Sequence, residues 1–182
     1  ARVEHAAVLL PTSRLVLVLG GRSSPGKAFS LSNEVVALDL RTRQWTSFPV
    51  SSLAPAPAAA TTASAHANVP APRWAHTAVS IPARDPVSDR VVVFGGRDLT
   101  SVFSDVWVLE KAPTWRWSCL ETRAANGDVA NVPGPRFAHA AAMLSPTQML
   151  VHGGLSNTAG EATGLAFVLD LTTREWTKCA WT

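Results

Sequence analysis

Three stretches of this chain, LVLVLGG at 15–21, VVVFGG at 91–96 and MLVHGG at 149–154, are short β-rich runs that end in two glycines. Each run has the same sequence context. An Arg-x-x-His motif precedes it, at Arg2/His5, Arg73/His76 and Arg136/His139. An apolar segment closed by an acidic residue follows it, and then a tryptophan. A pattern that recurs three times in one order, with units of this length, indicates a propeller or a solenoid.

Each repeat contains four short segments that read as β-strands. The first follows the Arg-x-x-His motif, and the second is the run into the glycine pair. The third strands are expected at 34–39, 105–110 and 165–170, where β-branched and aromatic residues alternate with others. The fourth strands carry Trp45, Trp117 (or Trp115) and Trp176. No stretch has an apolar stripe at helical spacing, so the sequence predicts an all-β fold.

The repeated residue types have physical reasons to stand where they do. Two glycines at a strand end permit positive φ angles and let a neighbouring backbone approach closely. A tryptophan on the outer strand can cover the seam between two sheets with a large apolar ring. One four-stranded sheet cannot bury both of its apolar faces, so the three units are expected to stack on one another.

Taken together, the motifs resemble the kelch repeat over nearly the whole chain. The resemblance implies a kelch-type β-propeller of four-stranded antiparallel blades, with three blades present as a partial ring. Propellers have four to eight blades, and the chain begins and ends at repeat edges without capping. We therefore expect further kelch blades outside this chain to complete the ring. A second copy of the chain is the alternative.

The repeats divide the chain into five segments. Blade 1 is assigned to 1–50, blade 2 to 73–121 and blade 3 to 136–182. Residues 51–72 form an Ala/Pro/Ser-rich linker, and residues 122–135 form a linker loop. Two prolines and two aspartates in 82–90 mark a long turn between the first two strands of blade 2.

A narrower resemblance lies in the residues that follow the glycine pairs. Arg22-Ser23-Ser24-Pro25 follows the first pair, Arg97 and then Phe103-Ser104-Asp105 follow the second, and Leu155 follows the third. This succession is similar to the kelch region of the tRNA wybutosine-synthesising proteins of the leucine carboxyl methyltransferase family. That resemblance implies a non-catalytic module within a tRNA-modifying, S-adenosylmethionine-dependent methyltransferase-like protein. The alternative is a protein–protein interaction adaptor or scaffold unrelated to tRNA.

Composition limits the classes of protein that the chain can belong to. With 182 residues, 47% hydrophobic and 16% charged, it can bury a core and is not disordered. Its net charge of +3 is compatible with an anionic partner. Two cysteines are too few for a disulfide framework and fit a cytoplasmic or nuclear location. No apolar run is long enough for a membrane span, and we expect neither a membrane partner nor a signal peptide.

The repeated polar residues are expected to be structural. His5, His76 and His139 occupy equivalent places in different blades, which argues against a shared metal, so we predict neither a metal site nor a cofactor. The acids Asp39, Glu110 and Asp170 end the third strands and are expected to accept hydrogen bonds from turn amides. Cys119 and Cys179 are expected to be buried or half-buried thiols without the basic neighbours of a reactive thiolate. No catalytic residue is predicted.

The arginines are the candidate binding residues. Arg22 and Arg97 follow glycine pairs, Arg73 and Arg136 begin first strands as Arg2 does, and Lys27 lies in the same class of loop. All of them are expected on one rim, where guanidinium groups bind phosphates or carboxylates bidentately. The rim would suit a tRNA backbone or an acidic peptide of a protein partner. The structural alternative is that the motif arginines form ion pairs between blades, for instance with Glu34 or Asp105. Trp74 and Phe137 are expected in the core.

Overall fold

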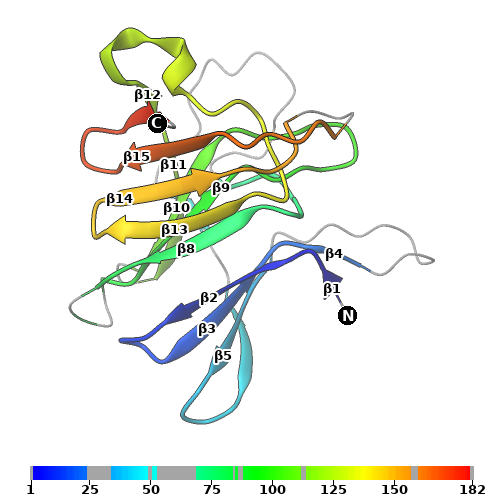
Figure 1. Cartoon of the computed structure of the whole chain (residues 1–182). Coiled ribbons are helices and arrows are strands. Elements are labelled where there is room, and N and C mark those ends of the chain that lie inside the picture. Colours follow the sequence, from blue (N-terminus) through cyan, green and yellow to red (C-terminus); the bar gives the residue numbers. More distant parts are fainter. Residues whose placement is uncertain are drawn as a thin grey trace.

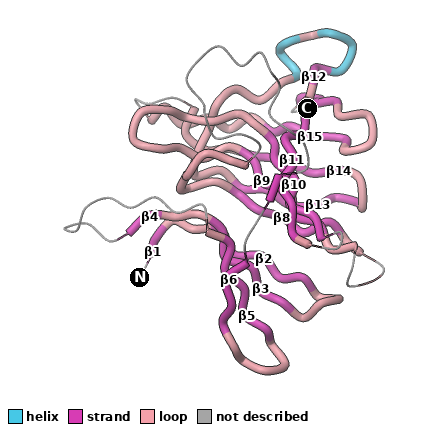
Figure 2. Tube along the Cα trace, turned by 180° about the vertical axis from the view of Figure 1, so that it is seen from behind, coloured by secondary structure: helices cyan, strands magenta, loops and turns pink. Residues whose placement is uncertain are grey.

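The computed structural model describes residues 2–23, 34–48, 69–83, 85, 88–111, 114–156 and 160–180, with the backbone of 51–52. These residues form three main β-sheets that lie one after another along the chain (Figure 1). We call them blades 1, 2 and 3. Viewed from behind, blade 1 splays away from the other two (Figure 2).

Every blade has four antiparallel strands in chain order. Blade 1 contains β2 (Ala6–Leu10), β3 (Leu15–Leu19), β5 (Val35–Asp39) and β6 (Trp45–Phe48). Blade 2 contains β8 (Thr77–Ile81), β9 (Arg90–Phe94), β10 (Val106–Lys111) and β11 (Trp115–Leu120). Blade 3 contains β13 (Ala140–Ser145), β14 (Gln148–His152), β15 (Ala166–Asp170) and β16 (Glu175–Lys178). The predicted all-β kelch-type propeller of four-stranded blades is confirmed.

The first strands lie at the centre of the fold. β2 contacts β8, and β8 contacts β13, so the three first strands stand side by side. A groove of about 440 Å³ runs between them, lined by Leu9, Val79, Ser80, Met143 and their neighbours. Strands two, three and four of each blade follow outward from this axis.

The hydrophobic core consists of two clusters, one at each junction between blades. Leu17, Leu19 and Val35 of blade 1 pack against Val91, Val93, Trp107, Leu109 and Trp117 of blade 2. Val92, Phe94 and Val106 on the other face of blade 2 pack against Met149, Val151, Phe167, Leu169 and Trp176 of blade 3. Stacking therefore buries sheet faces that no single blade could bury alone.

Strand register identifies the equivalent tryptophans. Trp45 pairs with Leu38, Trp117 with Leu109 and Trp176 with Leu169. Trp117, rather than Trp115, is thus the repeat tryptophan of blade 2. Trp117 and Trp176 are buried at blade junctions, as a seam-covering residue should be. Trp45 is the exception, because 58% of its surface is exposed.

Short strands from the connecting segments extend blades 2 and 3. β7 (Ser51–Ser52) runs parallel to β11 at the outer edge of blade 2. β12 (Arg123–Ala124) runs parallel to β16 in the same way and leads into two short 3₁₀ turns, Ala125–Gly127 and Val129–Asn131. A separate two-stranded ribbon joins β1 (Arg2–Val3) to β4 (Arg22–Ser23). The exit of one blade therefore covers the edge of the next.

The acid–tryptophan segments form the same turn in blades 1 and 3. An oxygen of Asp39 accepts hydrogen bonds from the amides of Arg41 and Thr42, at 2.7 and 3.2 Å. Asp170 accepts from Thr172 and Thr173, at 2.8 and 3.0 Å. These amide hydrogen bonds lower the pKa of both carboxyl groups. The predicted turn role is confirmed for these two acids, whereas residues 112–113, in the turn after Glu110, lie outside the described residues.

Candidate functional site: the loop rim

The rim is the end of the blades where the glycine pairs and the Arg-x-x-His motifs lie, and its glycines join neighbouring blades. The amide of Gly21 donates to the carbonyl of Arg73 at 2.9 Å, and the amide of Gly96 donates to that of Arg136 at 2.8 Å. A Cβ added at Gly20 or Gly95 would lie 2.6 Å from the same carbonyls. Both glycines also have positive φ, so a side chain at either position would strain the backbone as well as collide with the next blade.

The motif arginines bond inside their own blades. Arg73 is 3% exposed, donates to the carbonyl of Gly95 at 3.0 Å, and forms a bidentate ion pair with Asp105 at 2.5 and 2.8 Å. Arg2 makes the matching contacts to Gly20 and Glu34, both at 3.2 Å. The expected partners are therefore present, but each ion pair lies within one blade and not between blades.

Arg136 lacks this carboxylate because Leu165 stands where blades 1 and 2 carry Glu34 and Asp105. It is 2% exposed and donates to the carbonyls of Gly134 and Gly153, at 3.2 and 3.0 Å. Burial lowers the pKa of its guanidinium group. Arg73 and Arg136 are thus embedded beneath the rim, and their predicted binding role stays a prediction.

The motif histidines of blades 2 and 3 are buried at the blade junctions. His76 lies against Gly20 and His139 lies against Gly95. A hydrogen bond of 2.8 Å joins Thr77 Oγ1 to His139 Nε2. Burial, followed by the nearby Arg73, lowers the pKa of His76 to about 3, and burial with Arg136 lowers that of His139 to about 4. Both imidazoles are therefore neutral at pH 7.

Two arginines and two aromatic rings alternate across the rim. Arg22 lies over the Trp74 ring at 5.7 Å, Arg97 lies over the same ring at 5.6 Å, and Arg97 also lies over the Phe137 ring at 4.8 Å. Both rings are buried, so their predicted core role is confirmed. Cation–π contacts of this kind hold the two guanidinium groups beside these rings.

Arg22 and Arg97 differ in their partners. Arg22 forms an ion pair with Glu4. Arg97 donates from Nε to the carbonyl of Asp98 at 3.3 Å, and no carboxylate within the described ranges lies in ion-pair distance of it. Arg97 therefore retains guanidinium donors that face the rim surface. Lys27, the remaining predicted binding residue, lies outside the described residues.

The two free cysteines differ in exposure. Cys119 is exposed, which corrects the expectation of a buried or half-buried thiol, while Cys179 is half-buried as expected. Loss of hydration around the thiol, followed by the carboxylates of Asp105 and Glu121, raises the pKa of Cys119. A raised pKa disfavours the nucleophilic thiolate.

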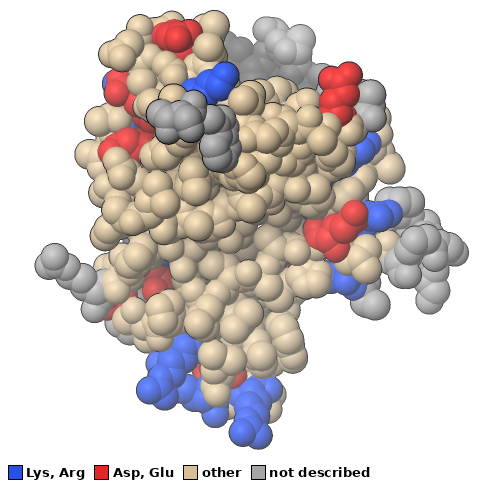
Figure 3. Space-filling view, viewed as in Figure 1, with Lys and Arg blue, Asp and Glu red and all other residues tan. Residues whose placement is uncertain are grey.

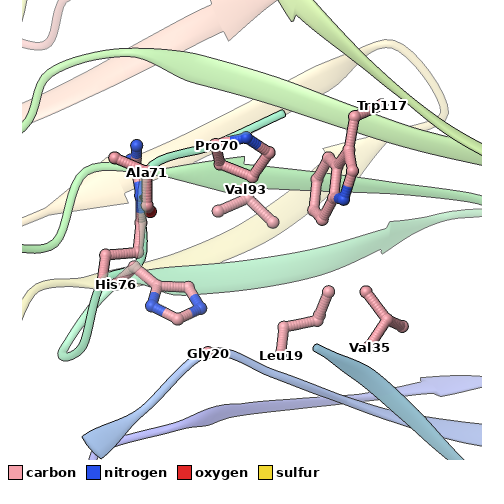
Figure 4. A pocket seen from close by; sticks show the side chains of 9 residues that line it. Leu19, Gly20, Val35, Pro70, Ala71, His76, Val93 and Trp117 are labelled. Carbon is pink, nitrogen blue, oxygen red and sulfur yellow. Dashed lines mark hydrogen bonds between the residues drawn. The ribbon is translucent and has the colours of Figure 1, made fainter. Parts of the chain in front are cut away.

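A small cavity lies at the junction of blades 1 and 2 (Figure 4). Leu19, Val35 and Gly20 line it from blade 1, and His76 and Trp117 line it from blade 2. Its volume of about 20 Å³ is enough for roughly one water molecule and far below that of a ligand pocket. The part of the chain that the structure describes contains no cluster of three metal-ligating side chains. It also contains no helix of the length and apolarity needed to cross a membrane.

Sequence reasoning missed two features of the charged surface. The pairing of Arg22 with Glu4 depends on the β1–β4 ribbon, which brings residues 18 positions apart together. A second group of arginines, Arg14, Arg41 and Arg43, lies exposed on the turns at the opposite end of blade 1. Basic atoms gather at this lower end of the molecule in Figure 3.

Comparison with known proteins identifies the repeat. The family model described as the KLHDC2/KLHL20/DRC7 Kelch-repeats domain matches residues 1–180. Host cell factor 2 of Homo sapiens is 33% identical over 121 residues, which are 60% of this chain and 14% of that protein. Putative adagio-like protein 2 and Adagio-like protein 1 of Oryza sativa subsp. japonica are each 33% identical over 152 residues, 78% of this chain and 20% of theirs. The chain thus spans a fifth or less of these relatives' length. The comparisons give no support to the wybutosine resemblance.

Proposed function

This chain belongs to the kelch-repeat family, a family of protein–protein interaction domains, and on that premise we propose that it binds a protein partner through the rim, with Arg97 binding a carboxylate of that partner. The single observation that carries the proposal is the placement of Arg97. Its guanidinium group is oriented by two aromatic rings, is only half-buried, and has no carboxylate partner in the described ranges.

The surroundings of Arg97 fit a protein better than a small molecule. The turn that follows it carries Leu99, which is 61% exposed, and the hydroxyl residues Thr100 and Ser101. The Asp98 carboxylate accepts hydrogen bonds from the amides of Thr100 and Ser101, at 2.8 and 2.6 Å, and these bonds hold the turn. An acidic side chain next to an apolar one would therefore find a cation and an apolar contact side by side.

The wybutosine resemblance supports a different partner for the same rim. A tRNA would place phosphates on Arg97 and Arg22, and its binding would weaken steeply with salt. The rim described here carries acids, Glu4 among them, next to its arginines. This mixture of charges favours a folded or extended protein segment over a nucleic-acid backbone.

Selection from a random peptide library on the immobilised chain tests the proposal. We expect the selected peptides to carry Asp or Glu next to an apolar residue. Arg97→Glu should weaken the best peptide at least about tenfold, because it replaces the attraction with a repulsion. Arg14→Glu, at the opposite end of blade 1, is the matched control and should bind as the original chain does.

Two results would contradict the proposal. Equal binding by the Arg97→Glu and Arg14→Glu chains would place the site elsewhere. Failure of all peptides, together with salt-sensitive binding of a phenylalanine tRNA that Arg97→Glu abolishes, would favour the tRNA alternative.

A further inference from the structure

Two neighbouring turns of blade 1 carry three exposed arginines at the end opposite the rim. Arg14 lies on the turn between β2 and β3, the inner turn, and Arg41 and Arg43 lie on the turn between β5 and β6, the outer turn. We call these three residues the turn arginines. Two hydrogen bonds join the turns. The Leu40 amide donates to the Arg14 carbonyl at 2.9 Å. Arg41 Nη2 donates to the Ser13 carbonyl at 3.2 Å.

The turn arginines are not neutralised by ion pairs. Among the residues that the structure describes, no carboxylate lies within ion-pair distance of any of the three. Asp39 begins the outer turn, and its carboxylate accepts hydrogen bonds from the amides of Arg41 and Thr42. Each guanidinium group has five N–H donors, so the contact of Arg41 with Ser13 leaves most of its donors for a ligand. Three positive charges therefore exceed the single negative charge of Asp39 at this end of the blade.

The exposure of the two turns follows from their place in the blade. Blade 3 packs against blade 2, and residues 172–174 of its outer turn, which match 41–43, are exposed all the same. Blade 2 has a neighbour on both faces, yet Pro82, Asp85 and Ser88 of its inner turn are exposed. These turns project beyond the sheet faces, so blade stacking leaves them accessible.

The inner turn of blade 1 is anchored to blade 2. Ser13 is buried, and its hydroxyl donates to the buried carboxylate of Asp89. Thr12 Oγ1 donates to the Ala83 carbonyl at 3.3 Å. The backbone that carries Arg14 is therefore fixed before any ligand arrives, which reduces the entropy lost on binding.

The turns themselves do not require arginine. Blade 3 has threonine at two of the three places, Thr147 for Arg14 and Thr172 for Arg41. It forms the same joined turns, because the Leu171 amide donates to the Thr147 carbonyl at 2.7 Å. Arg14 also has a φ of 58°, a left-handed conformation that favours glycine or asparagine. The fold therefore gives no reason for arginine at these places.

The extent of the charge indicates what kind of anion it fits. The inner turn of blade 2 lies next to that of blade 1 and carries the exposed acid Asp85. A nucleic-acid backbone is charged at every nucleotide and is bound by basic groups that continue along it. A phosphorylated side chain carries a charge of about −1.5 to −2 and three acceptor oxygens on one small group. A compact set of three guanidinium groups fits the phosphorylated side chain better.

We propose that the turn arginines bind a phosphorylated serine or threonine of a protein partner, at a second site opposite the rim. Guanidinium groups from the inner and outer turns donate to the phosphate oxygens together, as in other arginine clusters that recognise phosphorylated segments. This site does not involve Arg97, so it does not depend on the binding proposed for the rim.

Peptide libraries with a fixed central phosphoserine test the proposal. The immobilised chain should bind the best phosphopeptide at least about tenfold more tightly than the same peptide with serine, because charge-assisted hydrogen bonds are lost with the phosphate. Replacing Arg14 and Arg41 together by threonine should weaken the phosphopeptide by a similar factor. Blade 3 already has these threonines, so the double variant should keep the circular dichroism of the original chain.

A matched pair of single substitutions separates binding from turn structure. Arg43 and Arg174 occupy the same place in blades 1 and 3, with φ of 61° and 62°. Asparagine tolerates this conformation, so Arg43→Asn and Arg174→Asn should have the same small effect on stability. Only Arg43→Asn should weaken the phosphopeptide, because residue 174 has threonines, and not arginines, beside it at 147 and 172.

Several results would overturn this proposal. One is a phosphoserine library that yields no peptide preferred over its serine form. Another is equal phosphopeptide binding by the Arg43→Asn and Arg174→Asn chains. Tighter binding of a single-stranded DNA or of a free inositol phosphate, lost in the Arg14→Thr/Arg41→Thr chain, would assign the site to that anion instead.

The rim and the turn arginines can be tested separately. Arg97→Glu should leave the phosphopeptide bound, just as Arg14→Glu should leave the rim peptide bound. Loss of the phosphopeptide in the Arg97→Glu chain would overturn the second site, and the rim proposal would still be decided by its own peptides.

Discussion

A buried imidazole lies behind each glycine pair at the two blade junctions. His76 and His139 fill the space that the absence of a side chain at Gly20 and Gly95 leaves open. The equivalent His5 is exposed, so the same residue in the same motif has a different environment in blade 1. The difference depends on the neighbouring blade and not on the motif itself.

The two buried histidines should make the fold sensitive to acid. Their pKa values in the folded chain, about 3 and about 4, lie below the ordinary 6.5, so the unfolded chain binds more protons between these limits. The contribution of the two histidines to the free energy of unfolding is then fully present above about pH 6.5. It falls as the pH decreases, by up to roughly 1.4 kcal/mol per pH unit for each histidine. Urea unfolding of the chain between pH 4.5 and 7.5 measures this slope.

Single substitutions assign the acid sensitivity to a residue. His139→Gln should reduce the slope of unfolding free energy against pH, because one buried titrating group is lost. His5→Gln, at the exposed equivalent, should leave the slope unchanged. A His139→Gln chain with the original slope would show that other groups cause the acid sensitivity.

At the scale of the structural element, the glycine pair fixes how closely two blades approach. Gly95 has a φ of 63°, and a Cβ there would lie 2.6 Å from the Arg136 carbonyl and 2.9 Å from His139. Neither backbone nor buried ring can move without separating blade 2 from blade 3. The strand end is therefore a junction and not only a turn.

Replacing Gly95 with alanine should loosen the junction of blades 2 and 3. We expect a loss of about 2–4 kcal/mol in the free energy of unfolding, from the strained backbone together with overpacking. Gly127→Ala, with a φ of 71° and open space around its Cβ, should cost only the backbone term of about 1 kcal/mol. Denaturant titration compares the two chains, and equal losses would mean that the contact across the junction is unimportant.

At the scale of the whole molecule, the three blades are not equally covered. Blade 2 has a neighbour on both faces, and Val91, Val92, Val93 and Phe94 of β9 are all buried. Blades 1 and 3 each have one described neighbour, and only alternate residues of β3 and β14 are fully buried. In repeat architectures, stability is close to a sum over such nearest-neighbour interfaces.

Hydrogen exchange of the chain should show this gradient. We expect the amides of β9 to exchange at least about tenfold more slowly than those of β3 and β14, a difference of about 1.4 kcal/mol in opening free energy. Mass spectrometry of the exchanged chain measures it. Uniform protection across the three second strands would contradict the nearest-neighbour view.

The repeat made the blades predictable. Gly-Gly, Arg-x-x-His and the tryptophan recur at fixed places, and each has a local physical role that does not need distant information, such as positive φ at Gly95. The core positions of Trp74 and Phe137 could be predicted for the same reason. The exposure of Cys119 could not, because it depends on which face of β11 the neighbouring segments leave uncovered.

The candidate site was predictable only as a class of residue. Sequence order placed Arg22, Arg97, Arg73 and Arg136 on one rim, but it could not distinguish buried arginines from half-buried ones. That distinction comes from Asp105 and the carbonyls of the glycine pairs, which surround the motif arginines. It also comes from the aromatic rings on which Arg97 lies.

By itself, the sequence determined that this protein is built of three four-stranded kelch blades, because strand periodicity, glycine pairs and motif spacing are local properties of the chain. Only the tertiary structure decided which arginine remains available on the rim and which blade faces are uncovered. Burial and pairing depend on contacts between blades, and identical motifs such as those of His5 and His76 can have opposite exposure.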